Sequence, residues 1–108
     1  MSTKNTVDAE KYFRTKLGRL TLGEALKALR LSDEISQTEF AEKLGVSRQY
    51  LCDLEAGRKP VSVAKAAEFA KILKQPKEVF ITLAIQDELE RYKLPYTVSL
   101  AEKKKRVA

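Results

Sequence analysis

Four side chains that can bond to nucleic-acid bases lie close together in this chain: Arg48, Gln49, Tyr50 and Asp53. Arginine can donate two hydrogen bonds to guanine O6 and N7, and glutamine can pair with N6 and N7 of adenine. Tyr50 can pack on a thymine methyl group or bond to a phosphate. Asp53 can accept from cytosine N4, or can hold Arg48 or Gln49 in place. These residues predict a base-reading surface, and the alternative is an ordinary solvated helix face.

Two short helices joined by a glycine would position these residues. In the stretch ISQTEFAEKLGVSRQYLCDLEAG the first helix begins with the capping box of Ser36 and Glu39, and Gly45 ends it in a left-handed conformation. Ser47 can cap the second helix, 47–56, before Gly57. Helices joined by so tight a turn cross steeply, as in a helix-turn-helix that presents its second helix to the major groove of DNA. The alternative is a generic helical hairpin.

Three further helices are predicted. A second capping box, Thr21 with Glu24, opens a helix through about Leu31. Ser62 caps another helix, and Pro76 fits the first position of a last one, from about Lys77 to Tyr92. Alternation of Tyr96, Val98 and Leu100 indicates a short strand. The fold class is therefore all-α with five helices, to which a short C-terminal strand can be added.

The sequence divides into four segments. Residues 1–20 form a basic arm or contain a short helix, which the pattern allows over 6–18. Residues 21–75 hold the helix-turn-helix domain, residues 76–100 a helix and strand predicted to mediate dimerisation, and residues 101–108 a basic tail.

Composition argues against an enzyme. There is no histidine and only one cysteine, Cys52, so the usual general base and a His/Cys metal site are missing, and no cofactor is expected. No apolar run approaches the roughly 18 residues that a membrane span needs. The first residues lack the apolar core of a signal peptide, so we expect a cytoplasmic protein.

The formal net charge of +6 suggests an anionic partner. The charge is unevenly spread, however, because residues 31–60 carry four basic and six acidic side chains. Charge alone therefore does not identify nucleic acid as the partner.

Residues 22–73 resemble the lambda-repressor/Cro-type helix-turn-helix family, also called the XRE family. The resemblance rests on SQTEFAEKLGVSRQYLCDLEAGRK, with Ser36-Gln37, Ala41, Gly45-Val46-Ser47, Leu54-Glu55 and Gly57 in combination. It implies a sequence-specific transcriptional regulator of double-stranded DNA, as a rule a repressor that binds a palindromic operator as a dimer and regulates its own gene.

By this resemblance, the base-reading positions fall on Arg48, Gln49 and Asp53, with Tyr50 beside them. The implied phosphate contacts are Gln37, Ser47, Arg58 and Lys59. Glu55 is expected to be structural and paired with a nearby basic side chain. Asp53 departs from the amide or cation common at its position, and its charge would repel phosphate.

A homodimer interface is predicted on the last helix. Its apolar residues cover two sides, and a surface helix can bury only one of them within a small domain. The proposed interface consists of Ile81, Ile85, Leu89 and Tyr92. The alternative is that the N-terminal helix covers this side.

A toxin protein is an alternative partner. Short proteins of this family often serve as antitoxins that neutralise a toxin and repress their own operon. The predicted strand over 96–100 could pair through its edge with another protomer or with such a protein.

Overall fold

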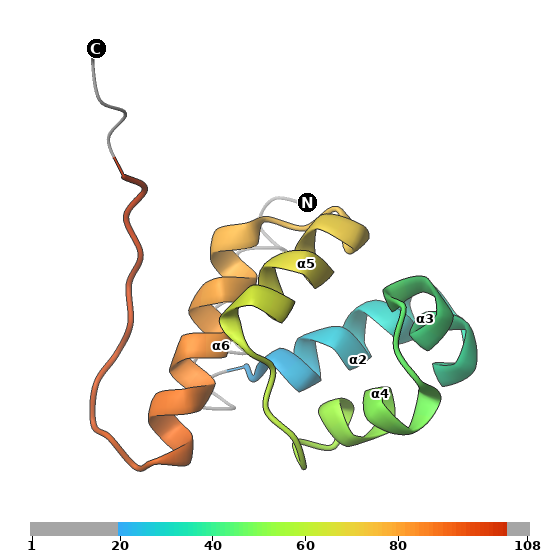
Figure 1. The fold of residues 1–108 in the computed structure, drawn as a ribbon, viewed down its shortest axis with the longest axis horizontal. Coiled ribbons are helices and arrows are strands. Elements are labelled where there is room, and N and C mark those ends of the chain that lie inside the picture. Colours follow the sequence, from blue (N-terminus) through green and yellow to red (C-terminus); the bar gives the residue numbers. More distant parts are fainter. Residues whose placement is uncertain (1–19, 104–108) are drawn as a thin grey trace, which may run out of the picture. The chain divides into compact units, whose positions relative to one another are not determined.

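The computed structural model describes residues 20–103, which form two compact units, one ending at Pro60 and the other beginning at Val61 (Figure 1). All regular structure in this range is helical, which confirms the all-α prediction. The helices are α2 (Leu22–Ser32), α3 (Gln37–Leu44), α4 (Arg48–Glu55), α5 (Val63–Leu73) and α6 (Lys77–Arg91). None of them is long and apolar enough to cross a membrane.

Side-chain caps start the first two helices, as predicted. The Thr21 hydroxyl accepts from the Glu24 amide at 3.1 Å, and the Thr21 amide donates to the Glu24 carboxylate at 2.9 Å. Ser36 and Glu39 form the same reciprocal pair at the start of α3. Both capping boxes satisfy amides that the helix itself leaves without partners.

The turn between α3 and α4 depends on Gly45, which has φ +75°. This left-handed conformation costs glycine nothing, whereas other residues pay for it through their Cβ atom. The chain then turns back, because the Val46 amide donates to the Ala41 carbonyl at 3.0 Å. Ser47 caps α4 by accepting from the Tyr50 amide at 3.0 Å. The predicted helix–glycine–helix element is confirmed.

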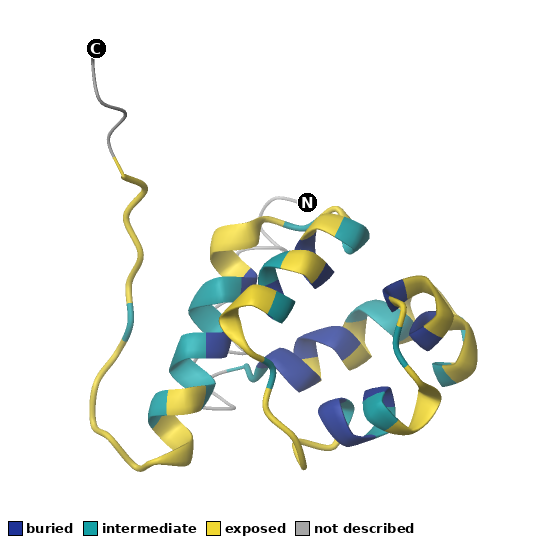
Figure 2. Ribbon diagram, in the orientation of Figure 1, coloured by how far each residue is buried: buried dark blue, intermediate teal, exposed yellow. Residues whose placement is uncertain are grey.

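Leucine and phenylalanine side chains form the core of the first unit. Leu22, Leu26, Phe40 and Leu51 are completely buried, and α4 packs against both α2 and α3 (Figure 2). Gly23 marks the closest approach of α2 to α4, because a Cβ atom there would clash with the Leu54 carbonyl oxygen. Hydrophobic burial and this backbone contact together fix α4 on α2.

The second unit is built on the packing of α5 against α6. Ser62 caps α5 as predicted, and Phe69 and Phe80 are buried. Pro76 is the N-cap of α6 and not its first residue as predicted. The shift is one position, because Pro76 has extended backbone with ψ 126°.

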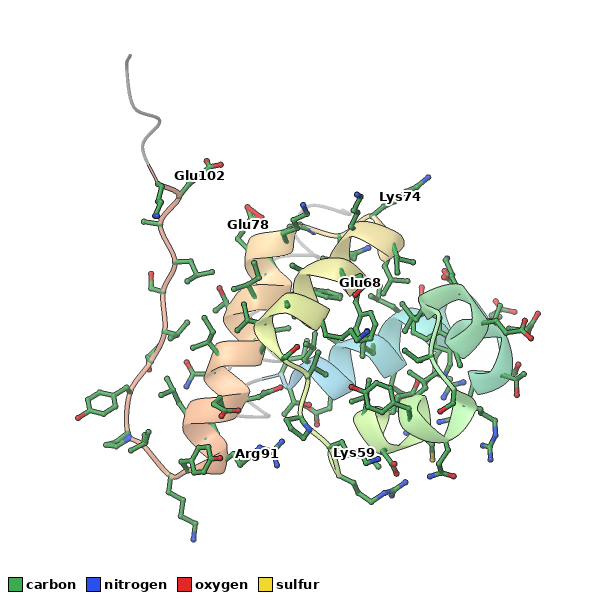
Figure 3. All side chains as sticks on the ribbon, in the orientation of Figure 1. Lys59, Glu68, Lys74, Glu78, Arg91 and Glu102 are labelled. Atoms are coloured by element: carbon green, nitrogen blue, oxygen red, sulfur yellow. The ribbon has the colours of Figure 1, made fainter. Side chains whose placement is uncertain are left out.

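The ends of α6 carry charges of opposite sign. Glu78 lies in the first turn and Arg91 in the last (Figure 3). Each charge is opposite to the partial charge of its helix end, so both favour the helix.

The short strand predicted over 96–100 is wrong. The described residues from Leu94 onward form neither helix nor strand. A strand needs a second strand to supply backbone partners. Here the side-chain amide of Gln86 on α6 takes that place, donating to the Tyr96 carbonyl at 2.9 Å and accepting from the Val98 amide at 2.8 Å.

Other sequence predictions fall outside the described residues. They include the arm or helix within residues 1–19 and most of the basic tail, 104–108. The functional segments 21–75 and 76–100 stay predictions, since the division at Pro60 concerns packing alone.

Candidate nucleic-acid interface

The N-terminal turn of α4 exposes the polar residues singled out in the sequence. Arg48 and Gln49 are exposed and Tyr50 is half-buried, whereas Leu51 and Leu54 face the core. The spacing of the two leucines fixes which side of α4 is buried, so Arg48 and Gln49 must face outward. The helix therefore offers a guanidinium and an amide at its N-terminal end.

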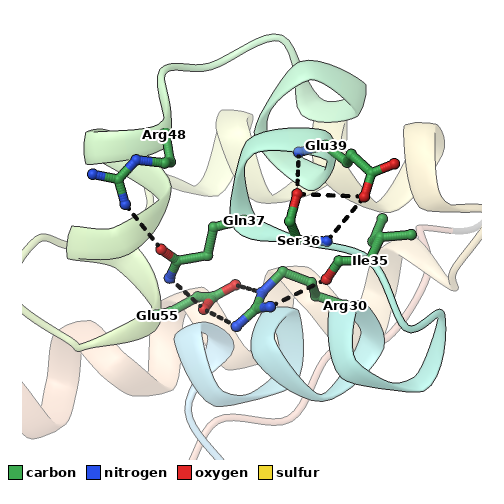
Figure 4. A network of polar contacts seen from close by, with 7 residues as sticks. All are labelled: Arg30, Ile35, Ser36, Gln37, Glu39, Arg48 and Glu55. Carbon is green, nitrogen blue, oxygen red and sulfur yellow. Dashed lines mark hydrogen bonds and ion pairs between the residues drawn. The ribbon is translucent and has the colours of Figure 1, made fainter.

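Gln37, the first residue of α3, connects Arg48 to the interior of the first unit (Figure 4). Its Oε1 accepts from Arg48 Nη1 at 3.4 Å, and its Nε2 donates to Glu55 Oε1 at 3.0 Å. Because a carboxylate can only accept, Glu55 fixes the Gln37 amide with its NH₂ group inward. The Gln37 carbonyl oxygen is thereby directed at Arg48.

Glu55 is itself held by an ion pair with Arg30 of α2. Arg30 Nε and Nη2 donate to the two carboxylate oxygens at 2.8 and 3.1 Å. The side chains are only 12% and 4% exposed, and Arg30 Nη1 also donates to the Ile35 carbonyl at 3.2 Å. The hydrogen bond to Glu55 raises the pKa of Arg30 above its ordinary value. The pairing expected for Glu55 is confirmed, and its partner is Arg30.

The Asp53 carboxylate accepts hydrogen bonds from neighbouring side chains and does not project from α4. Its residue is 8% exposed, and its Oδ1 accepts from Arg58 Nε at 2.9 Å and from Gln49 Nε2 at 3.2 Å. Lys59 Nζ lies 3.5 Å from Oδ2. The Arg58 hydrogen bond is the largest of the effects that hold the pKa of this carboxyl below its ordinary value. Of the two roles left open by the sequence, this geometry favours holding Gln49 in place.

Two cations follow α4 in the loop after Gly57. The side chains of Arg58 and Lys59 are each 56% exposed although both approach Asp53. Lys59 Nζ also lies 5.8 Å from the centre of the Tyr50 ring, within the range of a cation–π contact. Arg58 Nη2 lies 3.4 Å from the Cys52 sulfur. Asp53 therefore anchors both cations at the end of α4 while leaving them open to solvent.

The proposed dimer residues lie in the second unit. Ile81, Ile85 and Leu89 are half-buried on α6, and Tyr92 is 64% exposed. Phe80 and Ala84, which lie on the other apolar side of α6, are buried. Apart from the Tyr92 hydroxyl group, neither set carries a polar side-chain group.

Arg30 and Gly23 were missed by the sequence interpretation, although Arg30 carried a signal. It follows Leu22 and Leu26 at spacings of four on the buried side of α2, and Glu55 follows Leu51 at the same spacing on α4. Opposite charges on two apolar stripes predict a pair between the helices. Gly23 gave no such signal, because its role depends on which helix lies opposite.

The arrangement suits an anionic partner. No group of three or more His, Cys, Asp or Glu side chains in residues 20–103 could hold a metal ion. What the site offers is an oriented arginine and an oriented amide at the N-terminal end of α4, and two anchored cations in the loop that follows its C-terminal end.

Comparison with known proteins gives one match. A helix-turn-helix family model matches residues 26–80, a little over half of the 108 residues, and this range includes α3 and α4. Neither the curated proteins nor the solved structures give a significant match. The chain belongs to the helix-turn-helix family of the lambda-repressor/Cro type, the XRE family, whose members are DNA-binding transcription regulators.

Proposed function

We propose that this protein is a sequence-specific repressor that inserts the N-terminal end of α4 into the major groove of double-stranded DNA. The observation that carries the proposal is the exposed Arg48 guanidinium, directed by Gln37 and anchored through Glu55. Base readers need such pre-orientation, because an arginine that is already placed loses less conformational freedom on binding.

The base contacts are divided between two residues in this proposal. Arg48 donates to O6 and N7 of a guanine, and Gln49 pairs with an adenine. An amide NH₂ group has two hydrogens, so Gln49 can keep its bond to Asp53 and still donate to adenine N7. Tyr50 packs against a thymine methyl group or bonds to a phosphate, while Asp53 orients Gln49 from behind.

Phosphate contacts flank the base contacts. Arg58 and Lys59 supply charge at one end of α4, and Ser47 and Gln37 lie at the other. Each phosphate neutralised steepens the dependence of log affinity on log salt by roughly 0.9 units. Asp53 carries one negative charge beside the two cations, so the three side chains together contribute a net charge of about +1.

A single helix-turn-helix makes few contacts, so we propose a homodimer on a palindromic site upstream of its own gene. The half-exposed side of α6, Ile81, Ile85 and Leu89, together with Tyr92, supports a contact between protomers. Charged replacements at Ile81 and Ile85 would test this face, since they would yield monomers with weak operator affinity.

The decisive experiment selects binding sites from a randomised duplex library and then compares two variants on the selected site. Arg48→Ala removes the proposed base reader, and Lys43→Ala removes an equal charge from the last turn of α3, where the Lys43 Nζ atom lies 4.0 Å from the Asp33 carboxylate. We expect Arg48→Ala to cost about 1–3 kcal/mol and to relax the preference at one base pair. Equal losses in both variants, or no selected sequence, would overturn the proposal.

An antitoxin is the second candidate function. The exposed apolar side chains of Tyr92, Leu94 and Tyr96 favour it, since a toxin partner would cover them. Co-expression with the product of the neighbouring gene tests this: a stable complex that abolishes toxicity supports an antitoxin, and independent migration of the two proteins contradicts it.

A further inference from the structure

The segment after α6 runs extended along that helix (Figure 1). Its sequence has apolar residues at alternate positions. Tyr96 and Leu100 are 65% and 43% exposed, and Val98 between them is half-buried. The intervening Thr97 and Ser99 are small and polar. Such a segment has the side-chain pattern of a strand but lies beside a helix.

Only one backbone edge of this segment has partners. In extended chain, the N–H and C=O of one residue point to one edge and those of the next residue to the other. The Tyr96 carbonyl and the Val98 amide both bond to Gln86 of α6. The Tyr96 amide instead closes a three-residue turn at Pro95 by donating to the Leu94 carbonyl at 2.9 Å. Both groups that bond to Gln86 belong to even-numbered residues, so this edge faces α6.

The opposite edge, formed by Thr97 and Ser99, has no hydrogen-bond partner within residues 20–103. On the other edge, the side-chain amide of Gln86 supplies the hydrogen bonds that a neighbouring strand would supply. A strand held in this way, with its second edge free, is ready to pair with another strand.

We propose that residues 95–100 pair antiparallel with the same segment of a second copy of this chain, with the two-fold axis at Thr97. This proposal rests on the proposed homodimer and adds a backbone contact to the one proposed on α6. Thr97 would exchange two hydrogen bonds with its own copy, and each Ser99 amide would donate to the Pro95 carbonyl opposite. Pro95, which has no N–H, ends the ladder.

The sequence around Thr97 favours a second copy as the partner. Read outward from Thr97, the first residue on each side is apolar, Tyr96 on one side and Val98 on the other. Antiparallel pairing about Thr97 sets these two residues against each other, so Tyr96 meets Val98 of the copy. The apolar side chains thus form one shared face, as cross-strand pairs require.

Symmetric cross-linking tests this register without DNA. In a full-length Cys52→Ser background, Thr97→Cys places two thiols opposite each other, with Cα atoms about 5.5 Å apart, a separation that a disulfide can bridge. Ser99→Cys is the matched control, because it lies on the same edge but about 14 Å from its copy. We expect mild oxidation to convert most of the Thr97→Cys protein to a covalent dimer and little of the Ser99→Cys protein.

Equal cross-linking at both positions, or none at either, would overturn the proposal. A second variant, Thr97→Pro, removes the central amide donor on the free edge and leaves the Gln86 bonds in place. It should sediment as a monomer at concentrations where the parent chain is a dimer, and an unchanged dimer would also overturn the proposal. The cross-linking and sedimentation experiments contain no DNA. If the protein failed to bind an operator, their outcomes would still test the proposed pairing.

Discussion

Arg30 of α2 and Glu55 of α4 form a two-bond ion pair, with Nε–Oε2 and Nη2–Oε1 distances of 2.8 and 3.1 Å, almost out of contact with water. The pair lies directly behind Gln37, which bonds to the same carboxylate. One interaction therefore both joins two helices of the core and sets the orientation of a polar side chain at the surface.

Glu55→Ala should reduce the free energy of unfolding by about 3–5 kcal/mol, because it leaves the Arg30 guanidinium buried without its partner. Urea denaturation measures the loss. Asp33→Ala is the control, since its carboxylate is exposed and lies 4.0 Å from Lys43, an interaction worth about 0–1 kcal/mol. Replacing both partners, Arg30→Met with Glu55→Leu, should recover much of the stability. A double variant with a lower free energy of unfolding than Glu55→Ala would contradict this account.

Gly23→Ala should cost about 1–3 kcal/mol, because the added methyl group meets the Leu54 backbone and forces α2 away from α4. Gly45 provides the comparison: its φ is +75° but nothing lies within 4 Å of an added Cβ. Asparagine tolerates the left-handed conformation, so Gly45→Asn should be milder than Gly45→Ala. At position 23, asparagine should be at least as harmful as alanine. Thermal denaturation of the four variants measures these differences, and a Gly23→Ala protein as stable as the parent chain or more stable would show that crowding at Gly23 is unimportant, because alanine is otherwise the better helix former.

These two sites show what the sequence could and could not predict. Helix starts and the Gly45 turn depend on residues a few positions apart, so Thr21 with Glu24 and Ser36 with Glu39 were predictable. The Arg30–Glu55 pair joins residues 25 positions apart and depends on which helices meet. Gly23 is identified only by the backbone opposite it.

The candidate site follows the same division. The outward placement of Arg48 and Gln49 follows from the spacing of Leu51 and Leu54. The engagement of Asp53 by Arg58 depends on the loop after Gly57, whose path no local pattern defines. The predicted strand failed for a related reason, because the partner of residues 96–98 is a side chain, Gln86, and not a second strand.

Asp53 should contribute to stability in a pH-dependent way. The Arg58 hydrogen bond is the main cause that holds the pKa of its carboxyl below the ordinary value in the folded chain, whereas aspartate in an unfolded chain titrates at about 3.9. A lowered folded-state pKa stabilises the fold above the unfolded value, and this stability is lost as the pH falls through the folded value. Asp53→Asn should therefore lose stability at neutral pH and show a shallower decline below about pH 4. Urea denaturation at several pH values measures this, and parallel curves for the two proteins would contradict it.

The contact between Gln37 and Arg48 should appear as an energetic coupling in DNA binding. If Gln37 acts by directing Arg48, then removing either side chain removes part of the contribution of the other. In a double-mutant cycle on the selected site, Arg48→Ala and Gln37→Ala should couple by about 0.5–3 kcal/mol. Arg48 paired with Lys59, which it does not contact, is the control cycle and should be additive to within about 0.5 kcal/mol.

The double-mutant cycle, and not the salt dependence, separates the two roles open to Gln37. The Gln37 amide is uncharged and neutralises no phosphate in either role, so Gln37→Ala should keep the slope of log affinity against log salt. Lys59→Ala should reduce that slope by roughly one, because it removes a phosphate contact. Additive losses for Gln37 and Arg48 would show instead that Gln37 acts on DNA independently. In that event the oriented amide seen between Glu55 and Arg48 would be a feature of the free protein, exchanged for a phosphate when DNA binds.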